Sequence, residues 1–173
     1  IACKDRCEKQ LRVLEEGIDI VSGTVVEFEK DILHCKAKRT LPLSKEEILK
    51  FAGRRNPFNH PCVMYRKEAV EKAGGYQHFY LFEDYYLWAR MLLLGVEARN
   101  LPDTLLYMRA GTGMYKRRGG WKYVKSMLHF RLFLWKSGLS SFSDFVVCAG
   151  GQMMICLIPN RLRELFYKKF LRK

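Results

Sequence analysis

Apolar and polar residues change their spacing several times along the first part of the chain, and each change predicts a new element. Residues 5–16 place two leucines among charged neighbours, which predicts a helix that ends at Gly17. Residues 18–28 are rich in β-branched side chains and predict a strand with a break near Ser22 and Gly23.

The middle of the chain predicts further short elements. Ser44 and Glu47 have the spacing of a capping box, so a helix begins directly after Ser44. A short hairpin partner for the first strand is predicted near Ile32, and Pro102 separates two later strands. The other predicted elements are a strand at 62–65, helices at 67–73 and 84–94, and the strands at 96–101 and 104–108.

The last third of the chain has helical spacing. One predicted helix carries a stripe that suggests burial, formed by Trp121, Val124, Leu128, Leu132 and Trp135. Residues 145–158 form a mostly apolar run of 14, but a helix of about 21 Å is short of the roughly 30 Å hydrocarbon core of a bilayer. This run predicts a buried or interfacial helix. After Pro159 a basic amphipathic helix is predicted, which is typical of a membrane surface or of packing on its own domain. Its apolar face is Leu162, Leu165, Phe166 and Phe170.

These elements predict an α/β fold with a small mixed sheet, followed by mainly helical residues 119–171. Hydrophobic residues make up 49% and aromatic residues 13% of the 173 residues, which excludes an intrinsically disordered chain. Six cysteines are present without a Cys-x-x-Cys pair, so we expect reduced thiols in a cytosolic protein.

Nearly all of the excess positive charge lies in the last third. Residues 1–108 carry 17 Lys and Arg against 16 Asp and Glu, whereas residues 109–173 carry 14 against 2. Such asymmetry predicts an anionic partner, either ligand phosphates, nucleic acid or an anionic membrane surface. A solvated basic face without a partner is the alternative.

Three groups of residues are candidates for chemistry. Asp84, directly after Glu83, could act as a general base at a helix start, although its role as an N-cap explains the same position. Asn59 and His60 lie in a loop that leads into a buried strand, where a structural histidine is the alternative.

The third group is basic. Arg117 and Arg118 precede two glycines and a helix, an arrangement that could hold a diphosphate or remain an exposed loop. No metal-ligand spacing links the histidines and cysteines, so no metal ligand is assigned.

Several blocks in order resemble the inverting family 2 glycosyltransferases of bacterial polysaccharide biosynthesis. They are IACKDRCEKQLRVLEE (1–16), with Arg6 and Gln10 in the expected register, NPFNHPCVMYRKEAVEKAGGY (56–76), FEDYYLWARMLLLG (82–95), and the basic tail blocks MYKRRGGWKYVKS (114–126) and LIPNRLRELFYKKFLR (157–172).

The resemblance implies a partial GT-A fold, a Rossmann-like sandwich followed by C-terminal amphipathic helices. It implies sugar transfer from a nucleotide-sugar to an acceptor hydroxyl, with inversion, in capsule or exopolysaccharide synthesis. Asp84 is then the base, while Glu83, Asn59 and His60 form the acceptor site. Arg117 and Arg118 would bind the donor diphosphate.

The chain departs from the family in one respect, because no Asp-x-Asp occurs in it. We therefore expect residues 1–113 to be the acceptor-side half, with an uncovered sheet edge or face, and residues 114–173 to be a basic membrane-associating tail. The divalent metal (Mg or Mn) and the nucleotide-binding half would belong to the full enzyme, so this chain alone is expected to be inactive.

The expected partners are a nucleotide-sugar, a sugar or lipid-linked sugar acceptor, and an anionic membrane at the cytoplasmic face. Two other functions remain open, a nucleic-acid-binding module and a membrane-docking scaffold without catalysis.

Overall fold

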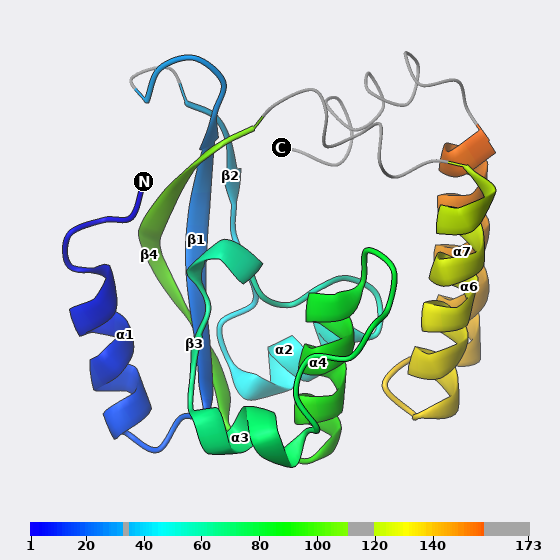
Figure 1. The fold of residues 1–173 in the computed structure, drawn as a ribbon, viewed down its shortest axis with the longest axis horizontal. Coiled ribbons are helices and arrows are strands. Elements are labelled where there is room, and N and C mark those ends of the chain that lie inside the picture. Colours follow the sequence, from blue (N-terminus) through cyan, green and yellow to red (C-terminus); the bar gives the residue numbers. More distant parts are fainter. Residues whose placement is uncertain (33–34, 111–119, 158–173) are drawn as a thin grey trace.

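The computed structural model describes residues 1–32, 35–110 and 120–157 (Figure 1). Its sheet is built around the buried strand β1 (Ile20–Phe28). Strand β4 (Ala98–Arg109) runs parallel to β1 along its whole length. Strands β2 (Cys35–Arg39) and β3 (Met64–Tyr65) pair antiparallel with opposite ends of β1. The predicted α/β fold with a mixed sheet is thereby confirmed.

Helices cover both faces of this sheet (Figure 1). Helix α1 packs on one face, and α2, α3 and α4 lie on the other. Beyond α4 stand α6 and α7, which we call the helical hairpin. The helices are α1 (Arg6–Glu15), α2 (Lys45–Ala52), the short 3-10 helix η1 (His60–Cys62), α3 (Lys67–Lys72), α4 (Glu83–Leu93), α6 (Trp121–Lys136) and α7 (Phe142–Leu157).

The local signals for helix ends are confirmed. Ser44 caps α2 through the predicted box, since its side chain accepts the amide of Glu47 and the Glu47 carboxylate accepts the amide of Ser44. Gly17 follows α1 with a φ of 90°, a conformation that suits glycine.

Two strand predictions are wrong in detail. The two strands expected around Pro102 are one strand, β4, with a bulge. Gly23 pairs with Leu101, and the next residue of β1 pairs with Thr104, so Pro102 and its neighbour are left out of the ladder. The bulge lets a proline, which has no amide proton to donate, lie within a strand. The strand expected at 62–65 is shorter, because its start forms η1.

The expected uncovered edge is not found along β4. Residues 1–3 run antiparallel to its outer side, where the Cys3 amide donates to the Leu105 carbonyl at 3.0 Å. The amide of Tyr107 donates to the Ile1 carbonyl at 2.8 Å. An extended segment ahead of α1 therefore satisfies polar groups that an edge strand leaves exposed.

The helical hairpin packs on α4 through only part of the predicted stripe, since Val124 is buried in this contact and Leu128 packs against it. Its buried side carries Tyr123, Val124, Met127, Phe130 and Leu134, which contact Phe82, Tyr85 and Ala89. Trp121 is 76% exposed and Trp135 is also exposed, so the expectation that these tryptophans are buried is wrong. Helix α6 has apolar residues on more than one side, and the position of α4 decides which side is buried.

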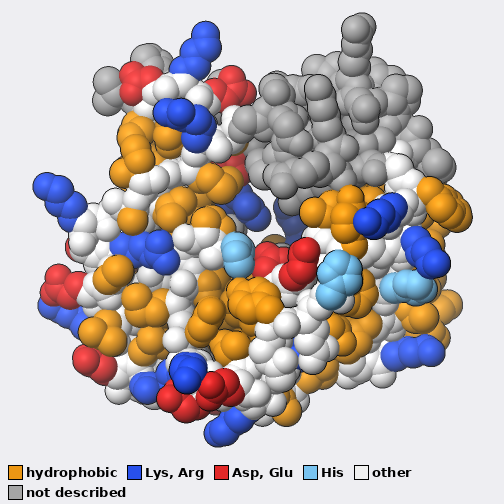
Figure 2. Space-filling view, in the orientation of Figure 1, with side chains coloured by type: hydrophobic (Ala, Val, Ile, Leu, Met, Phe, Trp, Pro, Cys, Tyr) orange, Lys and Arg blue, Asp and Glu red, His pale blue; other side chains and the backbone are white. Residues whose placement is uncertain are grey.

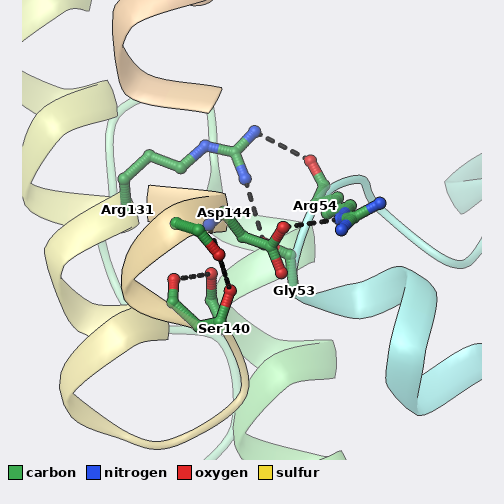
Figure 3. Close-up of polar contacts among 7 residues, drawn as sticks. Gly53, Arg54, Arg131, Ser140 and Asp144 are labelled. Carbon is green, nitrogen blue, oxygen red and sulfur yellow. Dashed lines mark hydrogen bonds and ion pairs between the residues drawn. The ribbon is translucent and has the colours of Figure 1, made fainter. Parts of the chain in front are cut away.

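Polar contacts also fix the hairpin to the end of α2 (Figure 3). The buried Arg131 guanidinium donates to the carbonyls of Gly53 and Arg54. The six cysteines all lie within the described residues, and no disulfide joins them there. No helix of the described residues is long and apolar enough to cross a membrane.

Candidate functional site

Asp84 lies in the first turn of α4, one residue after Glu83. The N-cap is Phe82, which makes no side-chain capping bond. Asp84 Oδ1 instead accepts the backbone amide of Tyr85 at 2.7 Å. Asp84 is therefore not the N-cap residue, but one of its oxygens does satisfy an amide that the first turn leaves unpaired.

The second oxygen of Asp84 faces the loop before η1. Asp84 Oδ2 accepts a hydrogen bond from Asn56 Nδ2 at 3.1 Å, and His60 Nδ1 lies 4.0 Å away. The Asp84 side chain is 29% exposed, so solvent or a ligand can reach the carboxylate. The structure thus brings Asp84 and His60 together, as the sequence hypothesis required of a shared site.

Asn56 is the neighbour that sequence reasoning missed. Its Oδ1 accepts the backbone amide of Phe58 at 3.2 Å, which closes a turn at the Asn-Pro pair and aims its amide group at Asp84. The Asn-Pro dipeptide was a visible turn signal. Its partner lies 28 residues away in the sequence, which a local pattern does not reveal.

Asn59 has a different environment. Its side chain is fully buried, and Nδ2 donates to the carbonyls of Gly23 at 2.8 Å and Arg39 at 3.0 Å. Its backbone amide donates to the hydroxyl of Ser22. Asn59 therefore ties the loop to the strands below it, and the structure does not bring its side chain to the surface beside Asp84.

The remaining predicted residues are more peripheral. Glu83 begins α4 and its side chain is exposed. Arg117 and Arg118 lie outside the described residues. The described residues contain no group of three or more His, Cys, Asp or Glu side chains that could hold a metal ion.

Packing fixes the start of α4 where Asp84 stands. Phe82 and Tyr85 are buried, and the Tyr85 hydroxyl donates to the Ala52 carbonyl at 2.5 Å. Burial raises the pKa of Tyr85 well above its ordinary value, so this hydroxyl stays a donor. Leu81, directly before the helix, has a φ of 62°, a conformation that costs a non-glycine residue about 1 kcal/mol or more.

Aromatic rings surround Trp88 one turn further along α4, and we call this group the Trp88 cluster. Trp88 itself is fully buried. The ring centroids around it lie 5.9–6.3 Å away and belong to Phe58, His60, Tyr65 and Tyr76. In Figure 2, red acidic atoms, a pale-blue histidine and orange apolar atoms adjoin near the centre of this face.

The site combines an accessible carboxylate, an imidazole and exposed rings. Burial, followed by the charges of Tyr65 and Asp84, raises the pKa of Tyr76 to about 12, so its phenol stays protonated. Asp84 is the carboxylate of this group, with neutral donors on both oxygens. Its arrangement suits the acceptance of a proton from a bound hydroxyl.

Comparison with known proteins identifies relatives over nearly the whole chain. This chain is 37% identical over 175 residues to the amylovoran biosynthesis glycosyltransferase AmsE of Erwinia amylovora, and the match covers 98% of this chain. It is 39% identical over 181 residues to an uncharacterized glycosyltransferase of Haemophilus influenzae, covering the whole chain. No family model matches the chain.

A third relative has a more specific name. The chain is 34% identical over 156 residues to an Escherichia coli UDP-Gal:alpha-D-GlcNAc-diphosphoundecaprenol beta-1,3-galactosyltransferase, covering 90% of this chain and 56% of that protein. The chain spans 64% and 65% of the length of the first two relatives. Its similarities are therefore to glycosyltransferases, one of them named for amylovoran biosynthesis, and each is longer than this chain.

Proposed function

We propose that this chain is the acceptor-side part of an inverting glycosyltransferase of bacterial surface-polysaccharide synthesis. Similarity to glycosyltransferases over 90% or more of the chain supports the class of enzyme. One observation carries the assignment of the site. Asp84 Oδ1 accepts the backbone amide of Tyr85, while Asp84 Oδ2 accepts the side-chain amide of Asn56 and lies 4.0 Å from His60 Nδ1.

In the proposed reaction, the acceptor hydroxyl donates its proton to Asp84 Oδ2. Its oxygen forms a bond to the anomeric carbon of the donor sugar while the bond from that carbon to the diphosphate oxygen breaks. The nucleoside diphosphate leaves with the bonding electrons, and attack from the opposite side inverts the anomeric carbon. Asn56 and the Tyr85 amide hold the carboxylate in place for this step.

Donor and acceptor classes are extended from the Escherichia coli relative, whose name specifies UDP-Gal and a GlcNAc diphosphate on undecaprenol. We propose a nucleotide-sugar donor and a lipid-linked sugar acceptor for this chain. The divalent metal expected for the full enzyme would be held by an Asp-x-Asp that this chain does not contain, and the described residues contain no group of three or more His, Cys, Asp or Glu side chains that could hold it. No step above depends on it.

The test is sugar transfer by the complete protein that carries this sequence. The donors are UDP-galactose, UDP-glucose and UDP-N-acetylglucosamine, and the acceptor is N-acetylglucosaminyl diphosphate on a short alkyl chain. We expect one donor to give a disaccharide whose new anomeric configuration, determined by NMR, is opposite to that of the donor. Retention of configuration would contradict the inverting mechanism, and absence of transfer from all three donors would contradict the proposed substrates.

We also propose that the helical hairpin and the segment after it dock on an anionic membrane at the cytoplasmic face. Helix α7 exposes apolar side chains on one side, namely Phe142, Val146, Val147 and Met154. The exposed Trp121 is followed by Lys122 and Lys125, both exposed. On the right of Figure 2, blue Lys and Arg side chains lie among orange ones over this hairpin. This mixture suits an interface where apolar groups enter and cations meet anionic headgroups.

Vesicle sedimentation tests the docking. We expect the protein to sediment with phosphatidylglycerol vesicles and much less with phosphatidylcholine vesicles. Removal of residues 159–173, which lie outside the described residues, should release it, and Val147→Glu should weaken binding through the α7 face. Equal binding to both vesicles, or binding unchanged by the truncation, would contradict the proposal. Single-stranded oligonucleotides at varied salt serve as the comparison, and tighter binding to them than to vesicles would favour a nucleic-acid-binding module.

A further inference from the structure

Two aromatic side chains next to Asp84 are exposed although they belong to a packed cluster. Tyr65 is 37% exposed and Tyr76 is 49% exposed, while Trp88 beneath them is fully buried. Their ring centroids lie 5.9 Å and 6.2 Å from that of Trp88. The indole thus carries two rings that keep part of their surface open to solvent. The exposed parts of these two rings do not contribute to the hydrophobic core.

The position of these rings is set by α4. Trp88 follows Asp84 by four residues, so both lie on the same side of the helix. His60 lies near both Asp84 and Tyr76. Its Nδ1 is 4.0 Å from Asp84 Oδ2, and its ring centroid is 6.5 Å from that of Tyr76. His60 therefore lies between the Asp84 carboxylate and the Tyr76 ring.

The backbone that carries each ring is fixed by hydrogen bonds. Tyr65 belongs to β3 and pairs with Ile20 of the central strand. Tyr76 follows Gly74 and Gly75, whose φ values of 78° and 64° form a tight turn. The Arg90 guanidinium donates to the carbonyls of Ala73 and Gly75 and fixes that turn. A ligand that stacks here would lose little affinity to ordering these side chains.

The chemistry of the surface favours a neutral ring over a phosphate. Arg66 follows Tyr65 in the sequence and Arg90 lies two residues after Trp88. Both arginines donate hydrogen bonds from their guanidinium groups to backbone carbonyls. A pyranose offers an apolar face of C–H groups, which suits an aromatic face, and hydroxyls at its rim, which suit carboxylate and phenol groups.

We infer that Tyr76 and Tyr65, supported by Trp88, stack against the acceptor sugar and present its hydroxyl to Asp84. This inference rests on the proposed glycosyltransferase function and names the substrate-binding surface of that site. Tyr76, with the larger exposed surface, provides the main stacking face. Its protonated hydroxyl donates to a sugar oxygen and does not compete with Asp84 for the proton.

Kinetics of the complete protein with the synthetic acceptor test this surface. Tyr76→Ala should raise the KM for the acceptor about tenfold or more, since loss of a stacking ring has effects of that order, and leave the KM for the nucleotide-sugar within about twofold. Tyr76→Phe keeps the ring and should stay within about threefold of the wild type. Tyr107→Ala, on β4 at the other side of β1, is the matched control and should change neither constant.

The outcomes separate this inference from the proposed function. If wild-type protein transfers sugar and Tyr76→Ala leaves the acceptor KM unchanged, the stacking surface is wrong and the function stands. If the synthetic acceptor is not used, saturation-transfer NMR with the methyl glycosides of N-acetylglucosamine, glucose and galactose tests directly whether a sugar binds at Tyr76. Contact through ring C–H protons that is lost in Tyr76→Ala and kept in Tyr107→Ala supports the surface. Absence of contact with all three, or contact that persists in Tyr76→Ala, overturns it.

Discussion

Asp84 and Asp144 occupy similar places in this protein and differ in their partners. Both lie in the first turn of a helix, α4 and α7 respectively. Their side chains are similarly exposed, at 29% and 21%. Asp144 Oδ1 forms an ion pair with Arg54 Nε at 2.7 Å (Figure 3). The backbone amide of Asp144 donates to the Ser141 hydroxyl at 3.1 Å. Asp84 has neutral amide donors on both oxygens, from Asn56 and Tyr85, and an imidazole at 4.0 Å.

The difference in partners distinguishes an ion-paired carboxylate, Asp144, from the carboxylate that we propose as the base, Asp84. The hydrogen bond from Ser141, followed by Arg54, lowers the pKa of Asp144 and makes its carboxylate a poor proton acceptor. The donors to Asp84 are two amide groups, the side chain of Asn56 and the backbone of Tyr85. The two aspartates have similar exposure and similar positions in their helices. Neither property would therefore distinguish the ion-paired Asp144 from the proposed base Asp84.

The largest expected effect is on catalysis. Asp84→Asn removes the proposed base, and in the complete protein the transfer rate should fall about 10²–10⁴-fold, or roughly 3–5 kcal/mol of barrier. Asp144→Asn is the matched control and should keep most of the rate. Transfer kinetics and thermal unfolding are measured for both variants. An Asp84→Asn protein that keeps its turnover but loses stability would show that the carboxylate only supports the helix start.

The next largest effect concerns the contact between the helical hairpin and α2. Arg131 donates to Gln152 and to the carbonyls of Gly53 and Arg54. Arg131→Met leaves one buried and two partly buried acceptors unpaired and should lower the free energy of unfolding by about 3 kcal/mol in urea denaturation. Lys125→Met, on the exposed side of α6, should stay within about 0.5 kcal/mol. Equal effects of both changes would show that this contact does not hold the hairpin.

The smallest effect is the pH dependence of the Arg54–Asp144 pair. The hydrogen bond from Ser141, followed by Arg54, lowers the pKa of Asp144 in the folded protein from its ordinary 3.8, so these contacts stabilise the fold above that pH. The contribution is lost as the pH falls below 3.8 and through the lowered value. The melting temperatures of the wild type and of Asp144→Asn should therefore differ at about pH 6 and converge toward about pH 2. A difference in melting temperature that persists at about pH 2 would show that the ionised Asp144 carboxylate and its contacts with Ser141 and Arg54 are not the cause.

Local patterns predicted much of the fold and part of the site. The capping box at Ser44 and the glycine after α1 are confirmed because their hydrogen bonds join residues a few positions apart. Asp84 was recognised because a helix start also has a local pattern. Asn56 was missed, and the buried role of Asn59 was not foreseen, because their partners lie 28 and 36 residues away in the sequence.

The sequence by itself determined the α/β class, most of the elements, the concentration of charge in the last third and the residue types available for chemistry. Only the tertiary structure decided which apolar side of α6 is buried, which tyrosines stay exposed over Trp88, and which aspartate meets an arginine. The physical reason is the separation along the sequence between the residues that interact. Helix and turn signals act through hydrogen bonds between near neighbours, whereas the partners of Asp84 depend on how a loop and a helix cross the same sheet.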